Sequence, residues 1–479
     1  MSAGFSISLN PVHSSSARRM EHVLTMLERH GIVKCSLLLF LLTVFVSILA
    51  TYVVRPLLNI ERPLGGEAYD GYLELGLNMA RGHGYVFEAG GHKVFHRPPL
   101  YPVLLMPLAA LPEFLWRLYV AVLNAALLSL TGVTLLKFVT ALFGKRVAWM
   151  SWLIFALNPF VIWAAKNALS AILQMFIYLL MVQMSWTILS LIRTQQGISS
   201  SFACRYTLIL FAGMLCHGTM LPIALLILSL LAIWSIHLRN WKDLLKLSMI
   251  VFSLITLLAP WTYRNYLVTG MFIPVAGNAG LAYFAGNAHW GITSAAVSAK
   301  ESRHEAELRH MNLPTETASK FIHYYGFTNP ALEHHATLEM KNHLRNQTRD
   351  FCRKFVLNAL EYYFPVVYYL FPPKNGGLAS EPLRKRLFVH ADKDTLPLSL
   401  YNFVLVSLSV SGLITLWKRQ QRVVMLVLLG SWSAYALSYF PFLTFVGHAL
   451  YNFGTIPIMA ILSTIPLCPK IINTEAKPT

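Results

Sequence analysis

Charged residues are scarce in this sequence. Asp, Glu, Lys and Arg make up only 13% of its 479 residues, whereas soluble globular proteins carry about 25%. Hydrophobic residues reach 56%, and the mean hydropathy is +0.53. This composition excludes an ordinary soluble enzyme. It predicts an all-α polytopic membrane protein, whose apolar helices cross the bilayer.

Acidic residues are the scarcer of the two charge types, with 21 against 39 basic residues and a net charge of +18. Part of the basic excess lies in short segments between apolar runs, where it sets membrane orientation. The sequence has no long basic run and no nucleic-acid motif, so we expect no nucleic-acid partner.

Cysteines and internal repeats are also sparse. The five cysteines are scattered, without a CxxC motif, so no disulfide framework is expected. No internal repeat of the kind found in many transporters is visible.

The apolar runs predict about ten membrane spans, within a range of eight to thirteen. Residues 1–34 are polar and basic and form an expected cytoplasmic tail, as do residues 467–479. The expected spans are about 35–54, 115–140, 147–165, 169–192, 206–220, 221–237, 244–262, 398–417, 423–440 and 443–466. The basic turns between them agree with the positive-inside rule.

Two long segments are expected outside the membrane. The first is a loop at 55–114, within a membrane core at 35–262. The second is an external loop or cap at 263–397, followed by C-terminal membrane helices at 398–466.

The first loop contains the densest set of chemically capable groups, between Gly65 and Pro102. Its spacing predicts an amphipathic helix over 66–81 at the membrane surface. One side of that helix would carry Glu67, Asp70, Glu74, Asn78 and Arg81, and the other Tyr69, Leu73, Leu77 and Ala80. Gly82 and Gly84 are expected to end it.

Glu67 and Asp70 lie three residues apart, so their carboxylates share one face of the helix. Such a pair can deprotonate a hydroxyl or an amine, or hold a divalent metal such as Mg²⁺ or Mn²⁺. The alternative is that the pair is simply the wet side of an interfacial helix. Both interpretations stay open at this point.

A second informative stretch runs from Pro260 to Asn287. Arg264 lies just outside an expected span, and a guanidinium is well suited to bind phosphate. The alternative is an interfacial anchor, in which Trp261 and Arg264 lie at the lipid headgroups. Further candidates on the expected external side are Arg97, Lys166 and His217.

Taken together, these segments resemble the GT-C superfamily of integral membrane glycosyltransferases. The similarity is to its family 39 branch, which is protein-mannosyltransferase-like, and to the related aminoarabinose transferases. The first-loop motif of that branch corresponds here to Asp70, the run Tyr72 to Tyr85, and Arg97 to Pro102. The second motif corresponds to Pro260, Trp261, Arg264, Asn265, Tyr266, Gly270, Phe272 and Pro274. The resemblance covers roughly residues 35–290.

The resemblance implies transfer of a sugar from a polyprenyl-phosphate donor to a lipid, glycan or protein acceptor on the external face. It assigns the role of base to Asp70, with Glu67 as the substitute, and donor-phosphate binding to Arg264, with Arg97 and Lys166 as further candidates. Candidate substrate contacts are Tyr72, Tyr101, His217 and Asn265. No cofactor follows with certainty, and a divalent metal at Asp70 stays open.

One position departs from the family pattern. A second acidic residue is usual just after the third span, but here Ser170-Ala171 occupies that place, and Gln174 is the nearest polar replacement. A non-catalytic assembly subunit therefore stays open as an alternative. A polytopic transporter also stays open, because about ten spans and a net positive charge suit one. The short basic N-terminus and compact loops favour a bacterial inner membrane, with the site on the periplasmic side.

Overall fold

The computed structural model describes residues 15–49, 71–158, 161, 165, 167–277, 279–287, 329–363, 382, 395–439 and 455–468. Within these residues the protein is all-α, as the composition predicts, and it contains no strand. The one β feature described is an isolated bridge between Val86 and Lys93 in the first loop.

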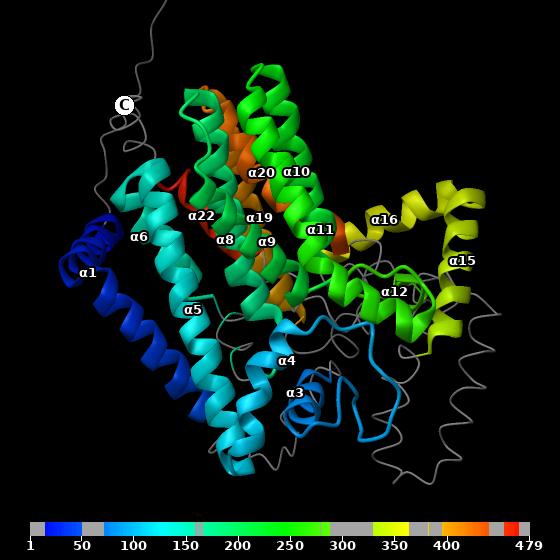
Figure 1. The fold of residues 1–479 in the computed structure, drawn as a ribbon. Coiled ribbons are helices and arrows are strands. Elements are labelled where there is room, and N and C mark those ends of the chain that lie inside the picture. Colours follow the sequence, from blue (N-terminus) through cyan, green and yellow to red (C-terminus); the bar gives the residue numbers. More distant parts are fainter. Residues whose placement is uncertain are drawn as a thin grey trace, which may run out of the picture.

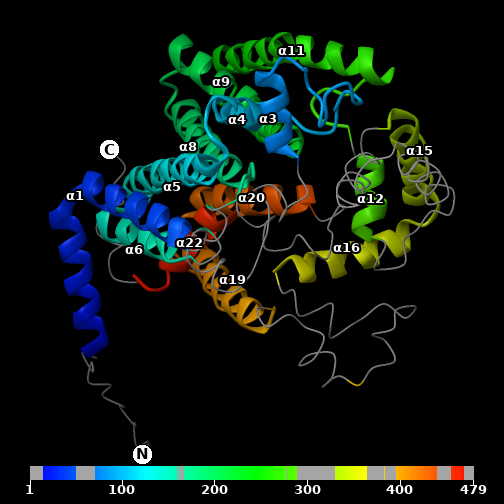
Figure 2. The same cartoon turned by 90° about the horizontal axis from the view of Figure 1, so that it is seen from below.

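Most helices form one bundle, shown in Figure 1 and from below in Figure 2. Its members are α1 (Ser15–Ile48), α5 (Glu113–Phe143), α6 (Lys145–Ala156), α8 (Ala171–Thr194), α9 (Ser200–Cys216), α10 (Met220–His237), α11 (Trp241–Thr269), α19 (Thr395–Lys418), α20 (Arg422–Tyr439) and α22 (Ile456–Thr464). One continuous apolar core joins them. α1 packs along α5 at one edge of the bundle.

Five helices in the described residues are long and apolar enough to cross a membrane: α5, α8, α10, α11 and the Ser399–Lys418 part of α19. The chain is therefore a multi-pass integral membrane protein. Shorter apolar helices occupy other expected spans, at Val33–Ile48, Ser200–Cys216 and Arg422–Ala436.

The expected third span, 147–165, differs from the structure. Its helix, α6, has only 12 residues and ends at Ala156. At 1.5 Å per residue it is about 18 Å long, which is short of the roughly 30 Å of a bilayer core. Asn158 precedes a proline in the sequence, and a residue before proline disfavours helical geometry. Asn158 instead bonds across the bundle to the Tyr401 hydroxyl, at 2.9 Å.

The short helix α22 lies inside the bundle, and all nine of its residues are buried. Gly412 of α19 lets the two helices approach closely, since a Cβ there would lie 2.1 Å from the Leu462 carbonyl oxygen. Ser409 and Ser463 add a hydroxyl contact at 3.2 Å between the same helices. Close packing through small residues is the usual way in which membrane helices associate.

A valine at Gly412 is accordingly expected to destabilise the protein by about 1–3 kcal/mol, because backbone cannot yield to the added side chain. The midpoint of thermal unfolding in detergent measures this. Gly430→Val is the matched control, because a Cβ at Gly430 meets no atom within 4 Å. Equal midpoints for the two variants would contradict the close approach.

The first loop forms a compact layer beneath the bundle in Figure 1, with α3 (Tyr72–Ala80), α4 (Leu100–Leu105) and the 3₁₀ helix η2 (Met106–Ala110). The described part of the expected 66–81 helix begins at Tyr72, after Gly71 in the left-handed region with φ 66°. It ends before Gly82 and Gly84, both of positive φ, which agrees with the prediction.

The predicted polar face of this helix was partly wrong. Asn78 is only 9% exposed, and its amide donates to the carbonyls of Val86 and Phe87, at 3.0 and 2.7 Å. Ala80, expected on the apolar side, is exposed. The reason is tertiary: α3 packs against α4 and η2, and the following loop folds back over its other side. The buried residues of α3 therefore pack against protein.

Three helices form a smaller unit beside the bundle: α12 (Ala279–Asn287), α15 (Pro330–Asn346) and α16 (Thr348–Tyr363). They have a separate apolar cluster around Leu281, Tyr283 and Leu332. The buried Glu333 carboxylate accepts from the backbone N–H groups of Gly280 and Leu281, at 2.9 and 3.0 Å. It thus caps the first turn of α12, where the helix dipole favours an anion.

Candidate functional site

Three of the predicted site residues, Glu67, Asp70 and Lys166, lie outside the residues that the structure describes. The other six fall into two groups that share the segment from Tyr85 to Arg97. Arg264 and Asn265 belong to the first group. Tyr72, Arg97, Tyr101 and His217 belong to the second.

The first group joins the two sequence motifs. A terminal nitrogen of Arg264, Nη1, donates to the Val94 carbonyl and to Asn265 Oδ1 at 3.0 Å. The guanidinium carbon lies 5.3 Å from the ring centre of Tyr85 and 5.1 Å from that of Trp261. Such cation–π contacts stabilise an arginine that lies against two aromatic rings. Arg264 therefore clamps the first loop onto the end of α11.

Asn265 holds the second motif in shape. It is fully buried, and its amide nitrogen donates to the carbonyls of Ile273 and Val275, at 3.2 and 3.3 Å. A side-chain amide has two N–H donors, so both are used. The structure gives Asn265 a framework role, whereas the sequence predicted a substrate contact.

The clamp predicts a stability effect. Arg264→Ala is expected to cost about 1.5–3 kcal/mol, the usual contribution of a hydrogen bond from a charged group, because the buried Val94 carbonyl loses its donor. The midpoint of thermal unfolding in detergent checks this. Tyr263→Ala is the control, since the neighbouring Tyr263 is 64% exposed. An unchanged midpoint with weakened donor binding would instead favour Arg264 as a phosphate ligand.

Tyr85 connects the two groups. Its hydroxyl is shared between the carbonyls of Arg97 and Pro98, at 2.9 and 3.0 Å. Burial raises the pKa of Tyr85 well above its usual value, so the phenol stays neutral and keeps its proton for these acceptors. This fixes the backbone that carries Arg97.

The second group surrounds Arg97. Its guanidinium lies over the ring of Tyr72, 5.5 Å from the ring centre. Tyr72 packs edge-on against Tyr101, at 5.5 Å between ring centres. The Tyr72 hydroxyl accepts a hydrogen bond from Ser170 Oγ at 3.2 Å. Arg97 is therefore brought close to the start of α8.

His217 approaches the same place from the turn between α9 and α10. Its Nδ1 lies 2.9 Å from Thr219 Oγ1, which also accepts from Gln174 Nε2 at 3.1 Å. Burial, aided by the positive charge of Arg97, lowers the pKa of His217 to about 3. The imidazole is thus neutral near pH 7, and Arg97 supplies the positive charge of this group.

The place where the family pattern expects a second acid lies within this group. Ala171 begins α8, and the first turn of this helix contains no acidic residue. Ser170 and Gln174 stand there instead and bond to Tyr72 and Thr219. The N-terminal end of a helix carries partial positive charge, which adds to that of Arg97. With no acidic residue in the first turn of α8, this positive charge is left to attract an anionic ligand.

Tyr101 is a supporting residue. It is fully buried, and its hydroxyl lies 3.4 Å from Asn124 Oδ1. The Asn124 amide in turn donates to the carbonyls of Ala165 and Asn167, both at 2.9 Å. Asn124 thereby holds the turn before α8.

Sequence reasoning did not single out Asn124, Thr219 or Tyr85. Asn124 gave a usable signal, because a lone amide inside an apolar helix needs a partner. Tyr85 ends the first motif run, which was a signal for that position. Thr219 offered none, since its bond to Gln174 joins positions 45 residues apart. Within the described residues no cluster of three His, Cys, Asp or Glu could hold a metal ion.

Fold and site together define a multi-pass, all-α membrane protein with an electropositive cluster at one end of its bundle. No family model, no curated protein and no solved structure matches the chain.

Proposed function

We propose that this protein is a membrane glycosyltransferase that moves a sugar from a polyprenyl-phosphate donor to a lipid, glycan or protein acceptor. The supporting observation is the contact between the two motif segments. Arg264 reaches the Val94 carbonyl across 170 positions of sequence, and the Gly277 N–H donates to the Phe95 carbonyl at 3.2 Å. The motifs on which the resemblance rests thus form one unit that carries Arg97.

The proposed chemistry needs a base and an anion site. The acceptor oxygen attacks the anomeric carbon of the sugar, and the bond from that carbon to the donor phosphate breaks. The acceptor proton passes to the Asp70 carboxylate, while Arg97 stabilises the charge released on the phosphate. Tyr72 and the N-terminal end of α8 lie beside Arg97. Lys166, which lies outside the described residues, is a second candidate cation.

The number of membrane spans and their orientation are part of this proposal. A GT-C-type core of about ten spans would combine the five long apolar helices with the shorter ones at Val33–Ile48, Ser200–Cys216 and Arg422–Ala436. In this proposal the Arg97 group lies on the external side, which is the periplasm for a protein of the bacterial inner membrane. The basic turns support that orientation through the positive-inside rule.

The distribution of charge disfavours the transporter alternative. In the described spans the ionisable residues lie towards the helix ends, as Lys242, Asp243 and Arg264 do in α11. Transport and coupling sites usually place such residues near the middle of the membrane. The assembly-subunit alternative draws its support from Ala171, at the position where the family carries an acid.

The test is a transfer assay with purified protein. A panel of polyprenyl-phosphate sugars is supplied with membrane extract as acceptor, with and without Mg²⁺ or Mn²⁺. We expect release of polyprenyl phosphate with at least one sugar. No turnover with any donor would refute the proposal. Uptake of a labelled substrate into vesicles, without chemical change, would then identify a transporter.

A further inference from the structure

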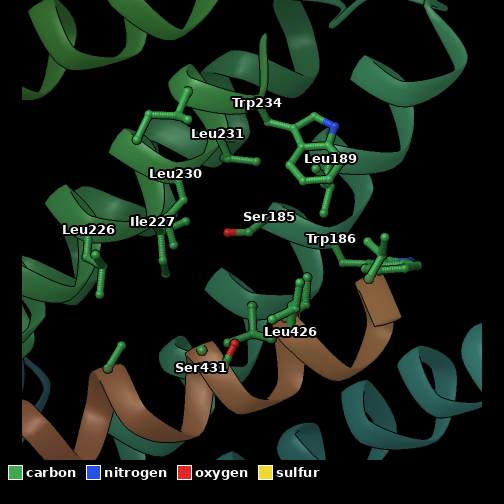
Figure 3. Close-up of a pocket in the computed structure, with 16 residues that line it drawn as sticks. Ser185, Trp186, Leu189, Leu226, Ile227, Leu230, Leu231, Trp234, Leu426 and Ser431 are labelled. Atoms are coloured by element: carbon green, nitrogen blue, oxygen red, sulfur yellow. The ribbon is translucent and has the colours of Figure 1, made fainter. Parts of the chain in front are cut away.

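A cavity of about 320 Å³ lies between α8, α10 and α20, away from the Arg97 group (Figure 3). Its lining residues on α8 run from Val182 to Leu189, and on α10 from Leu226 to Trp234. The stretch of α8 lies in the half of that helix far from Ala171, where it begins. The stretch of α10 runs from the middle of that helix towards its C-terminal end. This cavity has no part in the proposed transfer reaction.

The walls are almost entirely hydrocarbon. The few polar groups are mostly bonded elsewhere: Ser185 Oγ contacts the Tyr206 hydroxyl at 2.7 Å, and the Ser431 carbonyl accepts from Tyr178. The buried indole N–H of Trp234 has no hydrogen-bond partner within the described part of the chain. An apolar cavity of about 150 Å³ already stays dry and binds benzene. This one therefore suits a flexible hydrocarbon chain rather than water.

The cavity is open to the side of the bundle. Three of its lining residues, Leu230, Ile233 and Leu426, are 53%, 61% and 54% exposed. α10 is long and apolar enough to cross a membrane, so these side chains face lipid. A chain from the surrounding bilayer can enter between α10 and α20 without crossing a polar barrier.

One end of the cavity reaches a basic edge of the bundle. Trp234 lies three residues before the end of α10, and Val423 directly follows Arg422 at the start of α20. Three exposed arginines stand at these helix ends and at the end of α8: Arg193, Arg239 and Arg422. Such side chains attract anionic headgroups, and tryptophans near a membrane interface donate to polar lipid atoms.

We infer that this cavity binds one anionic phospholipid. An acyl chain fills the space between α8, α10 and α20, and the phosphate meets the arginines at the helix ends.

Lipid titration of the full-length protein, followed by native mass spectrometry, tests this inference. Phosphatidylglycerol and phosphatidylcholine with identical acyl chains are the probes. We expect tighter binding of phosphatidylglycerol. We also expect about fivefold weaker binding for each of Arg193→Gln and Arg422→Gln, since one basic residue contributes roughly 1 kcal/mol near a charged surface. Lys341→Gln, an exposed charge on α15, is the control.

Variants of Gly430 give a second, independent test of the inference. A Cβ there points into open space beside the cavity, so Gly430→Phe, or the smaller Gly430→Leu, fills it. Retained phosphatidylglycerol should fall by at least tenfold. Ala259→Phe adds the same bulk on the exposed side of α11 and should not change it. If the Gly430 variants do not fold, the arginine variants still test the inference, because they leave the cavity walls unchanged.

Three results would overturn the inference. One is equal binding of the two phospholipids. Another is unchanged binding in both the arginine and the folded Gly430 variants. The third is displacement of phosphatidylglycerol by an equimolar amount of polyprenyl phosphate, which would make the cavity a donor site instead.

Discussion

Replacing Arg97 with glutamine is expected to lower the turnover of a polyprenyl-phosphate sugar by about 10²- to 10³-fold. Loss of one fixed donor for developing negative charge has effects of this size. Arg97 is the cation that the structure places beside Tyr72, Ser170 and His217. Because His217 stays neutral near pH 7, it cannot replace the lost charge. Single-turnover release of polyprenyl phosphate is the measurement.

Two variants sharpen this result. Arg97→Lys keeps the charge but loses the planar fork, so it should recover part of the rate. Arg81→Gln removes an exposed arginine from the same loop and should leave the rate unchanged. A wild-type rate in Arg97→Gln would contradict the placement of the phosphate, and the Arg264 variants would then become the next test.

Asp70→Asn is expected to slow transfer by about 10²- to 10⁴-fold, the range of general base catalysis. Asparagine keeps the size of the side chain but cannot accept the acceptor's proton. Donor binding should therefore survive while the chemical step fails. Fluorescence or calorimetric titration with the donor, beside the transfer rate, separates these two quantities.

The paired variant Glu67→Gln decides which carboxylate acts. If Asp70 is the base, Glu67→Gln changes the rate by little, and the acid limb of the pH–rate profile disappears only in Asp70→Asn. The opposite pattern would assign the base to Glu67. Full activity in both single variants and in the double variant would remove the acidic pair from the mechanism.

Several local features of the fold could be predicted from the sequence. The class of protein followed from apolar runs, because a backbone in lipid must satisfy its own hydrogen bonds. The end of α3 followed from Gly82 and Gly84, whose positive φ is visible in the structure. These features depend on neighbours within one or two turns of chain, which a sequence shows directly.

The interior of the first loop could not be predicted in the same way. Asn78 has the spacing of a polar surface residue, yet it is buried against the carbonyls of Val86 and Phe87. Helical periodicity separates two faces but does not say what covers each face. The expected span 147–165 was wrong for a different reason. Its apolar run is long enough to cross a membrane, but the helix α6 already ends at Ala156, before Asn158-Pro159.

By itself, the sequence determined that this chain is a helical membrane protein and which motifs carry its candidate chemistry. Only the tertiary structure decided where the two arginines lie and what they contact. Arg264 is held against Val94, Tyr85 and Trp261, whereas Arg97 lies over Tyr72 beside the start of α8. Both have the same charge and a similar motif context. The difference arises from contacts between segments as much as 170 residues apart, which packing of the bundle selects and local periodicity does not encode.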